Sequence, residues 1–129
     1  MIVVDTNVIA YLFVPGDRTN AAEGLRRRDA EWAAPLLWRS EFRNVLATLV
    51  RLGRLELPIA QAIQEQAERL LEPLEFALDS ETVLALAASS DCSAYDCEFV
   101  ALAEYLDVPL VSADRKLKAR FGKRVRVLS

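Results

Sequence analysis

The stretch Ile2-Val3-Val4-Asp5-Thr6-Asn7 opens the chain with three apolar residues followed at once by three polar ones. An unbroken run of β-branched side chains favours a short strand buried on both faces, which is typical of a parallel sheet. An acid directly after such a strand lies at the carboxyl end of the strand, where open α/β sheets bind their ligands. The stretch therefore predicts a parallel sheet and makes Asp5 the first candidate site residue.

Short apolar strands alternate with helices along the rest of the chain. Further strands are expected over residues 31–34, 75–78, 109–112 and 125–128. Helices are expected over residues 18–28, 36–52, 58–71, 80–89 and 94–106, with Gly53 as the stop of the helix over 36–52. A first helix is expected after a cap at Thr6 or Asn7, and Ser80 and Ser93 are expected to cap the helices over 80–89 and 94–106. A short basic helix is expected to begin at Asp114. This alternation predicts an α/β fold, a three-layer α/β/α sandwich with a mainly parallel central sheet. A length of 129 residues indicates one domain, residues 1–129.

The composition excludes several classes of protein. The chain contains no His, so Ser-His-Asp, Cys-His and His-zinc chemistry are excluded. Its two cysteines, Cys92 and Cys97, do not have a zinc-site spacing and are expected to be reduced thiols in a cytoplasmic protein. No apolar run approaches the roughly 18 residues of a membrane span. The stretch 1–7 has no basic region and no long apolar run, so it is not expected to act as a signal peptide.

Charge is distributed unevenly, although the formal net charge is only -3. All 19 acidic residues precede residue 115, and every charged residue after that point is basic: Arg115, Lys116, Lys118, Arg120, Lys123, Arg124 and Arg126. A second basic cluster is formed by Arg26, Arg27 and Arg28. Each cluster is either a solvated face or a surface that contacts a phosphate backbone, and the sequence leaves both open.

Three more acids stand where an acid is unexpected. Glu41 lies three residues after Trp38 and four before Val45, on the apolar face of its predicted helix. Ionised Glu is rarely buried without a partner, and this face offers no basic residue for a buried salt bridge. Asp96 shares the inward face of its helix, although a helix-capping role is an alternative. Asp114 follows the strand over residues 109–112, where it either caps the next helix or belongs to a site.

One acidic pocket explains all four positions together. Clustered carboxylates repel one another, and a divalent cation removes this repulsion. Because only oxygen ligands are available, the ion is expected to be Mg²⁺ or Mn²⁺. Such sites usually act on phosphate esters, where the metal activates a water molecule. An aspartyl-phosphatase site at Asp5 is an alternative, but those enzymes usually need a second acid two residues later, where this chain has Asn7.

The acids also lie within stretches that resemble a known family. VVDTNVIAYL (3–12), SEFRNVL (40–46) and SAYDCEFVALAEYLDVPLVSADRKL (93–117) are similar to PIN-domain proteins, and specifically to VapC-type toxins of toxin–antitoxin pairs. The resemblance implies an α/β/α sandwich and a Mg²⁺- or Mn²⁺-dependent endoribonuclease. It implies that the acids bind metal and catalyse: Asp5, Glu41, Asp96 and Asp114. It also implies supporting roles for Thr6, Asn7 and Ser112.

The resemblance further implies a homodimer and a small antitoxin whose C-terminal segment blocks the active site. One departure is Lys116, which stands where many members carry another acid, so a second metal ion would be weakly held. RNA contacts are expected from Arg39 and Arg43, which flank Glu41, and from the basic segment that begins Arg115, Lys116 and Lys118. Solvated surface charges are the alternative for all of them.

Two further hypotheses remain at this point. The apolar residues of 46–71 exceed what two surface helices need for one core face, which indicates a dimer interface or simply two well-buried helices. A PIN-like module that binds RNA or a partner with little or no catalysis is the alternative to the nuclease.

Overall fold

The computed structural model describes residues 1–129 and has a five-stranded sheet in the order β3-β2-β1-β4-β5. The strands are β1 (Ile2–Val4), β2 (Trp32–Pro35), β3 (Glu75–Phe76), β4 (Leu110–Ser112) and β5 (Val125–Val127). Every neighbouring pair is parallel. The predicted α/β fold with a mainly parallel sheet is therefore confirmed.

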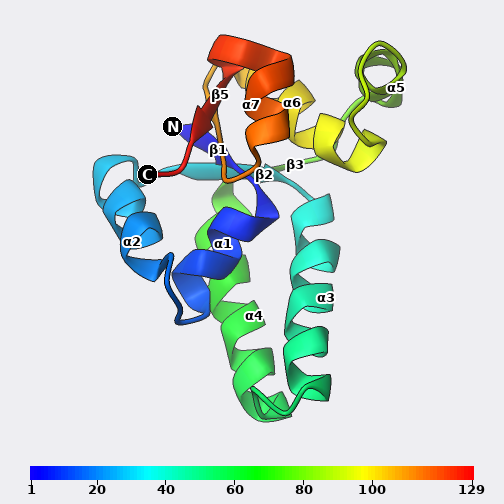
Figure 1. The fold of residues 1–129 in the computed structure, drawn as a ribbon. Coiled ribbons are helices and arrows are strands. Elements are labelled where there is room, and N and C mark those ends of the chain that lie inside the picture. Colours follow the sequence, from blue (N-terminus) through cyan, green and yellow to red (C-terminus); the bar gives the residue numbers. More distant parts are fainter.

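Helices cover both faces of this sheet (Figure 1). They are α1 (Thr6–Phe13), α2 (Thr19–Arg28), α3 (Leu37–Arg51), α4 (Leu57–Leu71), α5 (Ser80–Ala88), α6 (Ala94–Leu106) and α7 (Arg115–Phe121), with single 3₁₀ turns η1 (Glu72–Leu74) and η2 (Gly122–Arg124). Figure 1 shows α1 to α4 on one side of the sheet and α5 to α7 on the other. The chain runs outward from β1 to β3 and then returns to β4 beside β1. Because parallel crossovers are right-handed, this reversal places the later helices on the opposite face.

The reversal creates a crevice between β1 and β4, at the centre of the sheet. In the register of this pair, Val4 lies opposite Val111, and the Asp5 amide donates to the Val111 carbonyl at 3.2 Å. Asp5 directly follows β1, and Asp114 comes two residues after β4. The topology alone therefore brings these two acids to the position where α/β sheets bind ligands.

The core supports this edge of the sheet from both faces. All three residues of β1 are at most 1% exposed, and Trp32, Trp38 and Phe42 are fully buried beside them. The helices α3 and α4 form a long hairpin (Figure 1), which Gly53 closes with a φ of +72° that few other residues adopt. No helix is both long enough and apolar enough to cross a membrane.

Two predicted helix caps are wrong, because the observed caps lie one or two residues earlier. Asp5, rather than Thr6 or Asn7, caps α1, and its Oδ1 accepts from the Val8 amide at 3.0 Å. Asp79, rather than Ser80, caps α5. In both cases the Asp keeps an extended backbone while the following residue is already helical, and this defines the cap. The predicted Ser93 cap on α6 and the Asp114 start of α7 are confirmed.

Candidate active site

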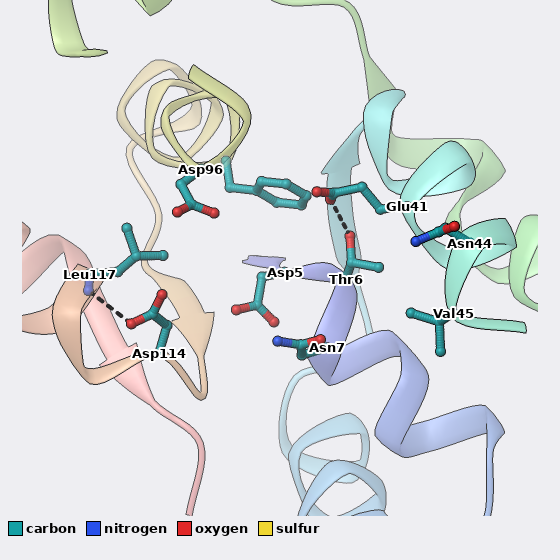
Figure 2. Close-up of a pocket in the computed structure, with 10 residues that line it drawn as sticks. Asp5, Thr6, Asn7, Glu41, Asn44, Val45, Asp96, Asp114 and Leu117 are labelled. Carbon is teal, nitrogen blue, oxygen red and sulfur yellow. Dashed lines mark hydrogen bonds between the residues drawn. The ribbon is translucent and has the colours of Figure 1, made fainter. Parts of the chain in front are cut away.

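A hollow of about 270 Å³ opens where β1 and β4 lie side by side. Its lining contains all four predicted acids, Asp5, Glu41, Asp96 and Asp114. They come from four separate parts of the chain: the end of β1, the helix α3, the first turn of α6 and the start of α7. Figure 2 shows Asp5, Asp96 and Asp114 converging on one space, with Glu41 to one side of it.

Asp5 is held at the base of the hollow and is only 9% exposed. Its Oδ1 accepts from the Val8 amide, and its Oδ2 accepts from the Ser112 hydroxyl. Ser112 is fully buried, and its Oγ in turn accepts from the Asp114 amide at 2.9 Å. Ser112 therefore connects the carboxylate at the end of β1 with the backbone of the acid that follows β4.

Glu41 is half-buried on α3 and turns toward the start of α1. Its Oε1 accepts from the Thr6 hydroxyl at 2.7 Å (Figure 2). No basic residue pairs with it, so the alternative of a buried salt bridge is wrong. Thr6 thus has a clear structural role, because it fixes the orientation of a carboxylate that lacks a charged partner.

Asp96 and Asp114 both line the hollow, but only Asp114 caps a helix. The Asp96 amide donates to the Ser93 hydroxyl at 3.0 Å, but its carboxylate has no hydrogen-bond partner in the protein and points into the hollow (Figure 2). The Asp114 Oδ1 accepts from the amides of Lys116 and Leu117, at 2.8 and 3.4 Å. For Asp114 the two alternatives, cap or site, are therefore compatible with each other, whereas the capping alternative for Asp96 is wrong, because its carboxylate makes no capping hydrogen bond.

The hollow disfavours negative charge, although four acids line it. Burial raises the pKa of Asp5 from 3.8 to about 6, despite the hydrogen bonds from Ser112 and Val8 that lower it. Burial is also the main cause that raises the pKa values of Glu41 and Asp96. Repulsion between the carboxylates raises these pKa values further: Asp114 raises those of Asp5 and Asp96, and Asp96 raises that of Glu41. A bound cation would offset both effects.

The donor set fits a hard divalent cation better than any other ligand. No Lys, Arg or Cys lines the hollow, and the polar lining consists of carboxylates, two carboxamides and one hydroxyl. As the side chains are placed, no three acids or thiols form a complete metal cluster. Hydrogen bonds hold Asp5, Glu41 and Asp114 in their present orientations, while the carboxylate of Asp96 is not held. An ion could therefore bind here only if these side chains rotated toward one another.

The two arginines expected at the rim of the hollow lie elsewhere. Arg39 forms hydrogen-bonded ion pairs with Glu75 at 2.7 Å and with Glu68 at 2.9 Å, and Glu75 also accepts from the Trp38 indole. Arg43 lies on the groove between α3 and α4, 4.0 Å from Glu68. Residues two positions apart on a helix do not share a face, so Arg39 and Arg43 point away from Glu41. The ion-pair partner of Arg39, Glu75, lies on β3. We therefore no longer expect Arg39 to contact a substrate.

The basic residues of α7 lie nearer to the hollow. Lys116 donates to the Asp91 carbonyl at 3.0 Å, and its charge lowers the pKa of Asp96, which places it within electrostatic reach of the site. Lys118 donates to the carbonyls of Gly122 and Val125 and is thereby tied to the turn that follows its own helix. Arg115 is exposed and has no ion pair.

The hollow also has lining residues that the sequence analysis did not select: Asn44, Val45, Phe99 and Leu117. Phe99 and Leu117 are core residues at most 3% exposed, and they give the hollow its apolar wall. Asn44 follows Glu41 by three residues on α3, so helical spacing from Glu41 was a sufficient signal to find it. The predicted Asn7 lines the hollow from the first turn of α1.

Comparison with known proteins identifies the family. Residues 2–121 match the PIN domain family, and the chain belongs to it. Its relatives include Ribonuclease VapC3 of Pyrobaculum aerophilum, which is 31% identical over 123 residues, covering 93% of this chain and 94% of that protein.

Solved structures show the same fold at lower sequence identity. PAE2754 of Pyrobaculum aerophilum superposes with a TM-score of 0.78 at 21% identity, over 98% of this chain and 90% of that one. A toxin–antitoxin complex from Klebsiella pneumoniae gives a TM-score of 0.75 at 16% identity, over 100% and 98% of the two chains. The three-layer PIN architecture predicted from the sequence is therefore confirmed.

Proposed function

We propose that residues 1–129 form one PIN-like nuclease domain, a Mg²⁺- or Mn²⁺-dependent endoribonuclease that hydrolyses RNA phosphodiester bonds. The observation that carries this proposal is the convergence of Asp5, Asp96, Asp114 and Glu41 on a hollow that contains no basic residue. The similarity to a protein named a ribonuclease, over nearly the whole length of both chains, supports the choice of RNA as substrate.

Each acid has a role that follows from its position. Asp5, Asp96 and Asp114 would hold the metal ion, and Glu41 would either bind it as well or orient a water molecule through its second carboxylate oxygen. A bound ion lowers the pKa of that water and stabilises the charge on the phosphoryl oxygens. Ser112 keeps Asp5 in place, and Thr6 does the same for Glu41.

RNA reaches the hollow past the basic helix α7. Arg115 and Lys116 stand in the first turn of this helix, directly after Asp114. Long-range attraction of phosphates to this segment offsets the repulsion from the acidic remainder of the chain. Because such contacts are made to the backbone, they position the RNA without selecting a sequence.

We further propose that the chain acts in the cytoplasm as the toxin of a type II toxin–antitoxin pair and forms a homodimer. The tip of the α3–α4 hairpin exposes Leu52, Leu57 and Ile59, each at least 51% exposed, and this apolar surface supports an interface there. The small antitoxin partner would place its C-terminal segment over the acidic hollow and so exclude RNA.

The proposal is tested by incubating total cellular RNA with the protein and Mg²⁺ or Mn²⁺. We expect discrete cuts from the wild-type chain that disappear when metal is chelated and in Asp5→Asn and Asp96→Asn. Asp17→Asn is the matched control, because Asp17 is an exposed acid between α1 and α2 that forms no ion pair and does not line the hollow. Cuts that survive in both site variants would contradict the proposal.

The alternative function is a PIN-like module that binds RNA or a partner protein without cutting. The observation that favours it is that no three acids form a complete metal cluster as the side chains stand. If the folded protein shows RNA binding but no cleavage at saturating Mn²⁺, the module is the better description. Trapping of a phosphate on Asp5 would instead support the phosphatase hypothesis.

A further inference from the structure

The side chain of Asn44 stands in the hollow without a partner in the protein. Asn44 lies at the middle of α3, one turn beyond Glu41, and lines the hollow together with the four acids. Figure 2 shows it projecting from α3 on the same side of the helix as Glu41. Its backbone carbonyl accepts from Thr48, but its carboxamide makes no hydrogen bond within the chain.

The fold gives no reason for an Asn at this position. Asn is one of the weaker helix formers, because its side chain competes with the backbone for hydrogen bonds. Here it is exposed, far from either end of α3, and it caps nothing. A residue that weakens its own helix and makes no compensating contact is typical of a functional position.

The chemistry of a carboxamide differs from that of the other polar groups around it. The acids bind a cation, and none of them can donate a hydrogen bond while ionised. Asn44 both donates and accepts, carries no charge and binds Mg²⁺ less strongly than a carboxylate does. These properties suit the neutral parts of a nucleotide, the ribose 2′-hydroxyl and the edge of the base, which also donate and accept.

We propose that Asn44 is a substrate-contact residue that hydrogen-bonds the ribose or base of a nucleotide beside the phosphate that is cut. The proposal rests on the ribonuclease function proposed above. Asn7, on the facing helix α1, provides a second carboxamide at the same hollow. The acids then act on the phosphate, while Asn44 recognises the nucleotide attached to it.

The test compares Asn44→Ala with Thr48→Ala, which makes a similar change one turn further along α3 at an exposed residue outside the hollow. The substrate is a short RNA that contains one cut site found in cellular RNA. We expect Asn44→Ala to lower kcat/KM roughly tenfold, the effect of one lost hydrogen bond, and Thr48→Ala to leave it unchanged. Mn²⁺ binding is expected to be the same in both variants as in the wild type, and the melting temperature of Asn44→Ala equal or higher.

Modified substrates then identify the atom that Asn44 contacts. A 2′-deoxy nucleotide beside the cut, or a changed base there, should lower the kcat/KM of the wild type by about the same factor as Asn44→Ala does on the unmodified RNA. In Asn44→Ala the same modification should lower kcat/KM little further, because the contact is already gone. Coupling to the 2′-deoxy change assigns the ribose, and coupling to the base change assigns the base.

Failure of this inference is distinct from failure of the proposed function. Two results would overturn the role of Asn44 while leaving the ribonuclease function intact. One is that Asn44→Ala cleaves with wild-type kcat/KM. The other is that its loss of kcat/KM is independent of both the 2′-deoxy change and the base change. Equal losses in Asn44→Ala and Thr48→Ala would also overturn it, because the effect would then belong to the helix. A wild-type chain that cuts no RNA would overturn the proposed function, and the role of Asn44 with it.

Discussion

Replacement of Asp5 by Asn is expected to stabilise the metal-free protein while it abolishes metal binding. Asp5 is 9% exposed, and its burial raises its pKa from 3.8 to about 6. The folded state therefore keeps this proton up to about pH 6, whereas the unfolded chain releases it near pH 3.8. Between these values the native state binds more protons, so the free energy of unfolding falls as the pH rises and stays lower above pH 6.

The size of the effect follows from the two pKa values. At about 1.4 kcal/mol per pKa unit, the ionised Asp5 costs the fold about 3 kcal/mol at pH 7. Asn carries no charge, and its Oδ1 caps a helix about as well as that of Asp, but its Nδ2 cannot accept the hydrogen bond from Ser112. Asp5→Asn should therefore recover only part of this free energy. The melting temperature at pH 7 should then rise by roughly 5 °C, and the gain should vanish at pH 4, where the wild-type carboxyl is protonated.

The assay is thermal and urea unfolding of both proteins at pH 7 and pH 4, with chelator present. Asp79→Asn is the matched control, because Asp79 caps α5 in the same way but is exposed to solvent, and hydrogen bonds from Thr82 lower its pKa. We expect no gain in stability from the control at either pH. A loss of stability in Asp5→Asn at pH 7, or the same gain at pH 4, would refute the claim that the hollow penalises this charge.

Three other outcomes follow from the same structure. Saturating Mg²⁺ or Mn²⁺ should raise the melting temperature of the wild type at pH 7 and leave that of Asp5→Asn unchanged, since only an intact site binds the ion. Equal shifts of the melting temperature in both proteins would argue against a specific site. Arg39→Ala should lower the free energy of unfolding, measured in urea, by about 2 kcal/mol, because it removes the hydrogen-bonded ion pairs with Glu75 and Glu68. Cleavage by the folded variant should stay at the wild-type level. A selective loss of cleavage would show that Arg39 belongs to the site after all. Leu57→Glu should shift the chain from dimer to monomer in light scattering, whereas Leu84→Glu on α5, at a residue that is at least as exposed, should not. A dimer that persists in Leu57→Glu would place the interface elsewhere.

The fold was predictable because its decisive signals are local. The apolar run of β1, the alternation of strands with helices and the Gly53 stop of α3 are all read from neighbouring residues. The misplaced caps at Asp5 and Asp79 have a simple reason, since Asp and the Ser or Thr beside it are both good caps. Which of the two is used depends on backbone angles that only the packed structure fixes.

The acids of the site were predictable from their conflict with their surroundings, but their partners were not. Helical spacing alone showed that Glu41 belongs to an apolar face. The link from Ser112 to Asp5 spans 107 residues, and that from Arg39 to Glu75 spans 36. Such contacts depend on how distant elements meet, so a single sequence supplies no partner for them. Arg39 was therefore assigned to the rim of the site although it stabilises the junction of α3 with β3.

The proposed nuclease activity requires above all that the four acids act as one cation site. The direct measurement is an Mn²⁺ titration followed by electron paramagnetic resonance, with the wild type, Asp5→Asn, Asp96→Asn and Asp114→Asn, and with Asp17→Asn as the exposed control. We predict saturable Mn²⁺ binding in the wild type and in Asp17→Asn, and a sharp loss of affinity in each of the other three variants. Unchanged affinity in those three variants, or no saturable binding to the folded wild type, would contradict the account.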